Sequence, residues 1–129
     1  MVKWNIWLTI LILTLFTSGC QSPGPVDEIE IKRAPIHEVR VSIAESYPPQ
    51  VFVYIKGGLA DSCTTFHGLE TERSGNTITI EVTTQWSKEA NCLQVYGFFE
   101  KNVNLGTDFT SGETYIINVN DMTTSFVMQ

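Results

Sequence analysis

The most reactive side chains of this chain belong to three cysteines, Cys20, Cys63 and Cys92, and two histidines, His37 and His67. Zinc sites place such residues at short, regular spacings such as Cys-x₂-Cys or His-x₃-His, and neither spacing occurs here. Thiols can instead be acylated or joined in a disulfide. We therefore expect no metal site and no cofactor.

A nucleophilic triad is the other chemistry that these residue types can support. Ser62, His67 and Asp61 are close in sequence, but the Gly-x-Ser-x-Gly turn that presents the serine of many hydrolases is missing. The Asn- and Asp-rich turns also lack the spacing of a calcium loop. We assign no catalytic residue, expect a protein that is not an enzyme, and interpret the histidines as one surface and one half-buried residue.

The first cysteine follows a segment that is typical of protein export. Lys3 precedes an uncharged, largely apolar run at residues 6–16, and the small residues 17–19 lead to Cys20. This pattern resembles a prokaryotic lipoprotein signal, although Thr17 stands where Leu is usual. The resemblance implies a signal peptide at residues 1–19 and a mature N-terminus at Cys20 that carries fatty acids such as palmitate.

The alternatives are an ordinary secretory signal with an incidental cysteine and a membrane-spanning helix. A span needs about 20 apolar residues, and this run is shorter. Residues 20–25 would form the lipidated cysteine and a Pro/Gly-rich tether. Proteobacterial lipoproteins of the inner membrane usually have Asp where this chain has Gln21. We expect a lipid anchor in the cell membrane or outer membrane, with the domain outside the cytoplasm.

Once Cys20 is acylated, Cys63 and Cys92 remain as a pair. An oxidising compartment favours a disulfide between them. The bond would close a loop of about 30 residues and stabilise the fold by roughly 3.5 kcal/mol. We predict that it is structural and not reactive.

The mature chain is small and acidic. Residues 20–129 contain 7 Lys/Arg and 14 Asp/Glu, a formal charge of −7, and their length suits one domain at residues 26–129. Without a cluster of Lys and Arg, the domain has no electrostatic reason to bind nucleic acid or to lie flat on anionic lipid. We expect the membrane to be reached through the lipid alone.

Apolar and polar residues alternate along the domain, which predicts half-buried β-strands. The runs contain Ile29/Ile31, Val39/Val41/Ile43, Val51/Val53/Ile55, Ile78/Ile80/Val82, Val103/Leu105, Tyr115/Ile117/Val119 and Thr124/Phe126/Met128. Turn residues such as Gly57-Gly58 separate them, and one helical turn is expected at residues 87–90. The pattern predicts an all-β, immunoglobulin-like antiparallel β-sandwich of seven or eight strands with one disulfide.

Two hairpins can be given a register. A two-residue turn at Asn120-Asp121 places Val119 opposite Met122, Ile117 opposite Thr124 and Tyr115 opposite Phe126. In the middle hairpin, pairing Leu69 with Ile80 or Val82 avoids burying Glu81 beside the leucine. This register predicts Cys63, His67 and Leu69 on the inner face and Phe66 on the outer face. The disulfide would then hold the 87–91 loop against its own hairpin.

The aromatic residues Tyr96, Phe98, Phe99 and Phe109 form a candidate binding patch. Because neighbours on a strand point to opposite sides, we expect one of Phe98 and Phe99 to be exposed and the other buried. Alternatively, a bulge at Gly97 turns both inward, or a second sheet or edge covers them. The aromatic residues Phe52, Tyr54 and Phe66 are further candidates for the outer face.

Two longer segments resemble known groups of proteins. The stretch SGETYIINVNDMTTSF is similar to the last hairpin of bacterial immunoglobulin-like domains. Residues 57–82 and 92–106 together resemble small secreted proteins of bacteria and archaea that are uncharacterised, which implies a secreted domain and no particular activity.

These features favour a membrane-tethered binding or adhesion module whose partner is an envelope protein. The alternative is an envelope peptidase inhibitor that inserts sandwich loops into a protease, as chagasin-like inhibitors do. The loop motifs of those inhibitors have no good match in this chain.

Overall fold

In the computed structural model, residues 19–20, 28–88 and 91–129 are described. The predicted signal peptide, apart from Gly19, and the tether after Cys20 lie outside these residues. So does part of the expected helical turn at 87–90, of which Ser87 belongs to a strand. The described part of the chain contains no helix long and apolar enough to cross a membrane.

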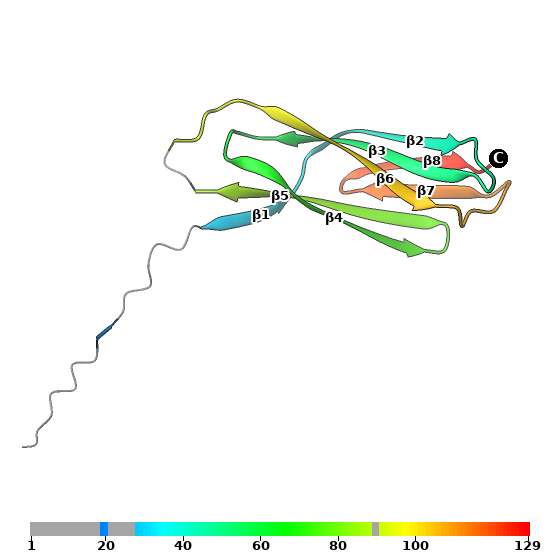
Figure 1. Cartoon of the computed structure of the whole chain (residues 1–129), viewed down its shortest axis with the longest axis horizontal. Helices are drawn as coiled ribbons and strands as arrows, with labels where there is room; N and C mark the ends of the chain where they lie inside the picture. Colours follow the sequence, from blue (N-terminus) through cyan, green and yellow to red (C-terminus); the bar gives the residue numbers. More distant parts are fainter. Residues whose placement is uncertain (1–18, 21–27, 89–90) are drawn as a thin grey trace, which may run out of the picture.

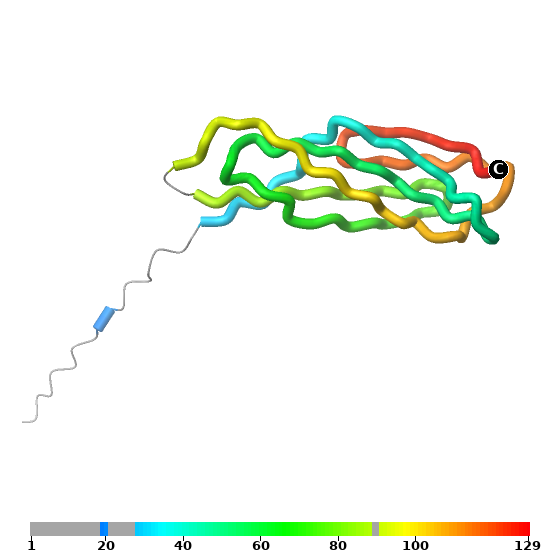
Figure 2. The backbone as a smooth tube through the Cα atoms, turned by 45° about the horizontal axis from the view of Figure 1, so that its top comes forward, coloured from blue at the N-terminus to red at the C-terminus, as the bar shows by residue number. Residues whose placement is uncertain are grey.

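Eight strands form two sheets that pack face to face (Figures 1 and 2), which confirms the predicted β-sandwich. The strands are β1 (Ile29–Arg33), β2 (Ile36–Ala44), β3 (Gln50–Leu59), β4 (Thr64–Ser74), β5 (Thr77–Ser87), β6 (Gly97–Gly106), β7 (Thr114–Val119) and β8 (Met122–Val127). One sheet has the order β2-β3-β6. In the other, β4 pairs with one edge of β5, while β1 and β7 share the opposite edge and β8 lies outside β7.

The core lies between the sheets and is built from the predicted alternation. Alternate residues of β3, β5 and β7 point inward, and nine of them are fully buried. These residues are Val51, Val53, Ile55, Ile78, Ile80, Val82, Tyr115, Ile117 and Val119.

One pair of strands departs from the antiparallel pairing expected for the sandwich. β5 and β7 are parallel, with Ile78 opposite Ile117 and Ile80 opposite Val119. The chain enters both strands at the same end of the molecule, because the β4–β5 turn and the β6–β7 connection lie at that end (Figure 1). Neighbouring strands entered from one end must run in the same direction.

The predicted register of the last hairpin is confirmed at all three positions. Val119 pairs with Met122, Ile117 with Thr124 and Tyr115 with Phe126. Asn120 in the turn has a φ of 50°, a value that asparagine tolerates better than most residues.

The middle hairpin confirms the register and corrects two faces. Leu69 pairs with Val82, as predicted. A β-bulge between Phe66 and Gly68 then inserts His67 as an extra residue. Because one extra residue reverses the faces of a strand, Phe66 packs against the core and His67 is exposed. The sequence placed these two side chains on the wrong sides.

Strand β1 has its apolar face outward, contrary to the expectation of a half-buried strand. Ile29 and Ile31 are 56% and 54% exposed. Glu30 and Lys32 pair with Trp86 and Thr84 on the inner side of β5. That inner side of β1 lines a pocket that it shares with Gly58 and Ala60 at the end of β3. Charged side chains are therefore tolerated there.

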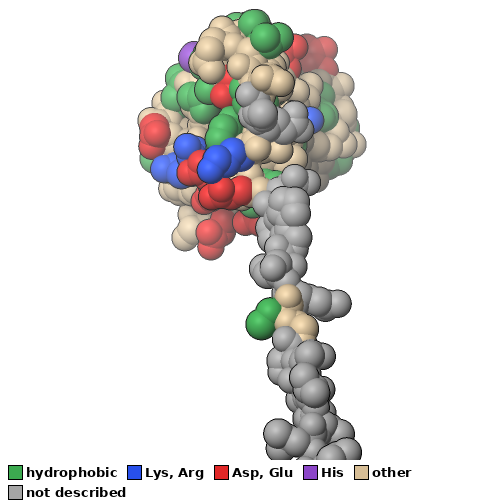
Figure 3. Space-filling view, turned by 90° about the vertical axis from the view of Figure 1, so that its left-hand side faces the viewer, with side chains coloured by type: hydrophobic (Ala, Val, Ile, Leu, Met, Phe, Trp, Pro, Cys, Tyr) green, Lys and Arg blue, Asp and Glu red, His purple; other side chains and the backbone are tan. Residues whose placement is uncertain are grey.

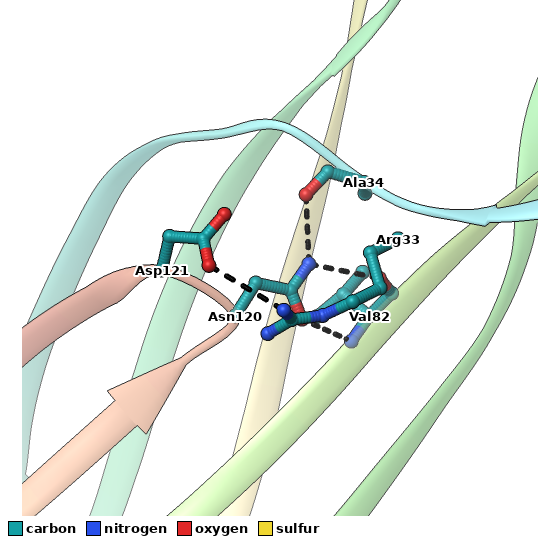
Figure 4. A network of polar contacts seen from close by, with 5 residues as sticks. All are labelled: Arg33, Ala34, Val82, Asn120 and Asp121. Atoms are coloured by element: carbon teal, nitrogen blue, oxygen red, sulfur yellow. Dashed lines mark hydrogen bonds and ion pairs between the residues drawn. The ribbon is translucent and has the colours of Figure 1, made fainter.

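Asn120 connects β1, β5 and the last turn through hydrogen bonds of its side chain (Figure 4). Its Nδ2 donates to the carbonyls of Ala34 at 2.7 Å and Val82 at 2.9 Å, and its Oδ1 accepts from the Val82 N–H at 2.9 Å. The amide thus continues the hydrogen bonding of β5 across the gap between β1 and β7. The sequence indicated the turn and not this bridging role.

Candidate functional site

One end of the sandwich carries most of the features that can contact another molecule. At this end β1, β4 and β6 begin and β3 and β5 end (Figure 1), so it is also the end at which the chain enters the domain. We call it the entry end. Cys20, the predicted lipidation site, precedes β1 in the chain and is exposed with a free thiol.

The predicted disulfide is confirmed and lies at the entry end. Cys63 and Cys92 are bonded, with their Cα atoms 5.4 Å apart. The Cys63 carbonyl accepts from the Ser87 N–H at 3.2 Å, so the cysteine lies level with the end of β5, as expected. Leu93 is bonded to Ser62 both through its N–H, which donates to Oγ at 2.7 Å, and through its carbonyl, at 3.0 Å. The segment after Cys92 is therefore fixed to the start of β4.

Two glycines in β3 make room for two aromatic rings. The sequence indicated Gly57-Gly58 as a break between strands, but both lie inside β3. A Cβ on Gly57 would be 2.1 Å from the Phe99 ring, and a Cβ on Gly58 would be 1.9 Å from the Tyr96 hydroxyl. Since successive strand residues face opposite sides, the first glycine seats Phe99 inside and the second seats Tyr96 outside.

We call His37, Tyr96 and Phe98 the aromatic cluster, because their rings contact one another on the outer face of β2-β3-β6. The His37 ring lies 5.7 Å from that of Tyr96 and 5.5 Å from that of Phe98, and the two aromatic rings are 5.4 Å apart. The Tyr96 hydroxyl is hydrogen-bonded to His37 Nε2 above Gly58. Phe98 is nevertheless 53% exposed. The arrangement presents an apolar ring that is held from two sides.

Charged residues surround the aromatic cluster on the same face. Lys56 Nζ lies 4.5 Å from the centre of the Phe98 ring. Two residues from Lys56 along β3, the Tyr54 hydroxyl donates a hydrogen bond to Glu100 of β6. This hydrogen bond raises the pKa of Tyr54. Arg40 stacks over Tyr54 at 4.4 Å. The face can therefore offer aromatic contacts and hydrogen bonds together.

The structure divides the predicted aromatic patch. Tyr96 and Phe98 come together as expected, and Phe99 is the buried neighbour, with its ring 5.3 Å from that of Phe66 in the core. Phe109 lies near the opposite end and packs on Tyr115 at 4.8 Å. Phe99 and Phe109 therefore do not belong to an exposed patch. The prediction of one exposed and one buried phenylalanine is confirmed.

His37 is the member of the aromatic cluster that the sequence reasoning missed. It is an extra residue in β2, where Ile36 pairs with Gly57 and Glu38 with Lys56. This bulge directs the imidazole toward Tyr96, and no residue spacing in the sequence predicts the bulge. A histidine beside a bulge would have been recognised only from the strand pairing.

A pocket of about 300 Å³ lies beside the cluster, between β1 and the end of β3. It is lined by Glu30, Lys32, Arg33, Pro35, Gly58, Ala60, Asp61, Thr64, Thr84 and Trp86. The Asp61 carboxylate accepts from Thr64 Oγ1 at 2.8 Å and from the Cys63 N–H at 3.0 Å. The hydrogen bond from Thr64 lowers the pKa of Asp61 most. The hydrogen bonds from the Cys63 N–H and the Trp86 side chain lower it further.

The three residues considered for a triad are each bonded to other groups. Ser62 binds Leu93, Asp61 binds Thr64 and Cys63, and His67 Nδ1 contacts Thr83 Oγ1 at 3.0 Å. Among residues 19–20, 28–88 and 91–129, no group of three or more His, Cys, Asp or Glu side chains is placed to hold a metal ion.

Comparison with known proteins gives a family and no activity. The ORF11 beta-sandwich domain matches residues 53–128. The uncharacterised 10.2 kDa protein in the HgiCIIM 5′ region of Herpetosiphon aurantiacus is 45% identical over 87 residues, which are 67% of this chain and 92% of that protein. The corresponding protein in the HgiBIM 5′ region is 46% identical over 77 residues, 60% of this chain and 93% of the relative. No solved structure matches. The matches show that the chain belongs to the ORF11 beta-sandwich family.

Proposed function

We propose that this protein is a lipid-anchored binding module of the cell envelope, exposed outside the cytoplasm, which captures a partner through the aromatic cluster. The observation that carries the proposal is the Phe98 ring, which is half exposed although it lies among His37, Tyr96 and Lys56. The partner is another envelope protein.

The geometry of the aromatic cluster favours binding for a physical reason. Interfaces depend on a few aromatic anchors, and these contribute most when little conformational freedom is lost on contact. Here Gly58 and the hydrogen bond with His37 hold Tyr96, and Tyr96 and His37 in turn pack against Phe98. The ring is thus oriented before a partner arrives.

The anchor is supported by the N-terminal sequence. The run at residues 6–16 and the small residues before Cys20 resemble a lipoprotein signal, and the disulfide joins Cys63 to Cys92 and does not involve Cys20. The thiol of a cysteine at this position is the group that lipoprotein processing acylates.

Photo-crosslinking in living cells tests the proposal. A photoreactive phenylalanine analogue would replace Phe98 in the full-length protein, and a matched control variant would carry it at Val127, which is equally exposed (54%) near the opposite end. We expect a discrete crosslinked protein from position 98 only. Equal crosslinking from both positions would contradict the proposal. Inhibition of papain or a serine protease that survives Phe98→Ser would favour the peptidase inhibitor.

A further inference from the structure

Four exposed apolar side chains surround the entry end of the sandwich. Ile29 and Ile31 project from β1, and Leu93 and Val95 follow the disulfide, with exposures of 66% and 62% for the latter pair. We call these four residues the apolar rim. Figure 3 looks onto this end and shows hydrophobic side chains beside Lys, Arg, Asp and Glu.

The apolar rim is held in place by the fold. Ile29 and Ile31 pair with Ser87 and Gln85 of β5. Leu93 is bonded twice to Ser62 and follows Cys92, which is joined to Cys63. Apolar side chains that the fold holds outward at one end form a candidate surface for an apolar contact.

The position of the anchor identifies what the rim contacts. Cys20 precedes Glu28, the first residue of the domain that the structure describes, by eight residues. A chain of that length spans at most about 29 Å. A lipid on Cys20 therefore keeps the entry end, and not the opposite end, next to the bilayer.

We propose that the apolar rim rests on the bilayer in which Cys20 is anchored, so that the domain stands on the membrane instead of moving freely on its tether. This inference rests on the proposed lipid anchor. It also goes beyond the expectation that the protein reaches the membrane through its lipid alone. The contact would be of the interfacial kind, in which apolar side chains enter the boundary between headgroups and acyl chains.

The charges at the entry end permit this contact. Glu28 is paired with Lys88 at 3.4 Å and Glu30 with Lys32 at 3.3 Å. Other acidic residues, including Glu72, Asp108 and Glu113, lie toward the opposite end of the strands. At the entry end these two lysines therefore offset the charge of Glu28 and Glu30, while Asp61 remains an acidic group there.

The mature protein contains its own probe for the contact. Of the three tryptophans, Trp4 and Trp7 precede Cys20, which leaves Trp86. Trp86 lies in β5 and pairs with Glu30 of β1, so it is level with the apolar rim. A nitroxide on the lipid headgroup would quench Trp86 only if the entry end remains close to the bilayer.

The experiment uses mature protein purified from cells with its natural N-terminus, in phosphatidylcholine vesicles that contain a headgroup nitroxide lipid. We expect strong quenching of Trp86 in the wild type and a several-fold loss with Leu93→Ser/Val95→Ser. The matched control Ile43→Ser/Val127→Ser changes two exposed apolar residues toward the opposite end and should quench like the wild type. Thermal unfolding of each variant would establish that it is folded.

Each outcome decides the proposal. Equal quenching in the wild type and the rim variant would overturn the membrane contact. So would wild-type protein that floats with the vesicles but shows no quenching. Both results leave the lipid anchor standing. If the rim variant loses quenching only at high protein density on the vesicles, a second copy of the protein covers the rim. That result also overturns the membrane contact. Wild-type protein whose N-terminal peptide lacks fatty acids by mass spectrometry, and which does not float, overturns the anchor and this inference with it.

Discussion

Asn120 performs two functions that a single residue type rarely combines. Its backbone adopts the positive φ of the last turn, and its side chain is hydrogen-bonded to Ala34, just after β1, and to Val82 in β5. Aspartate could support the turn but could not donate to both carbonyls. This residue therefore links the start of the domain to its end.

Replacing Asn120 with alanine should lower the free energy of unfolding by about 1–3 kcal/mol, because the Val82 N–H and the Ala34 carbonyl lose their hydrogen-bond partner in a partly buried site. Urea denaturation measures the change. Asn102→Ala, at an exposed position of β6, is the control and should have little effect. A loss as small as that of the control would mean that water replaces the amide.

The Asp61 carboxylate makes the stability of the entry end dependent on pH. Its pKa is lowered in the folded protein, first by the hydrogen bond from Thr64. A lowered pKa contributes stability that is present above the pKa of the unfolded chain and is lost as the pH falls through the folded value. Asp61→Asn should thus lower the Tm at neutral pH and leave it nearly unchanged in strong acid. A difference in Tm that is constant with pH would contradict this assignment.

At the scale of strands, the alternation of apolar residues predicted the strands, and the turn residues predicted the register of the last hairpin. The two-residue turn at Asn120-Asp121 determines which residues pair in β7 and β8, so that register could be derived. Bulges are different, because they depend on how a strand pairs with its neighbour in the same sheet. Both histidines, His37 and His67, lie at bulges, and each was given a role that the structure corrects or extends.

Strand β1 shows a second limit of sequence patterns. Ile29 and Ile31 alternate with charged residues as in any half-buried strand, but their face is outward. Alternation states that two faces differ and cannot state which face the other sheet covers. The same limit applies to Tyr96 and Phe99, whose positions on opposite sides of the sheet depend on where β3 provides a glycine.

The disulfide links the loop after β5 to the start of β4. Cys63→Ser/Cys92→Ser should lower the free energy of unfolding by roughly 2–5 kcal/mol, measured with urea on the secreted protein. Thiol titration of that protein should find neither Cys63 nor Cys92 reactive. Two reactive thiols in natively secreted protein would show that the bond does not form in the cell.

For the whole molecule, the fold class followed from the composition and the spacing of apolar residues, while the location of the aromatic cluster and the apolar rim did not. The acidic charge is spread along the sequence, yet the aromatic cluster and the apolar rim both lie at the entry end. Only the pairing of β3 with β6 and of β1 with β5 brings these residues to one end.

Cys20→Ser tests the anchor at this scale. The variant should remain unprocessed at Gly19-Cys20 and leave the membrane fraction where the wild type stays, because acyl chains supply the strong attachment. Mass spectrometry of the N-terminal peptide and cell fractionation measure both effects. A wild-type N-terminus that starts elsewhere and carries no fatty acid would contradict the lipoprotein assignment.

The most direct test of the binding module is the Phe98→Ser variant of the full-length protein. Because Phe98 is exposed, the Tm should remain within a few degrees of the wild type, whereas truncating a core phenylalanine such as Phe99 should cost about 3–5 kcal/mol. Capture of the envelope partner by Phe98→Ser should fall at least tenfold relative to the matched surface variant Val127→Ser. Capture by Phe98→Ser equal to that of Val127→Ser, with both variants folded, would contradict the proposed function.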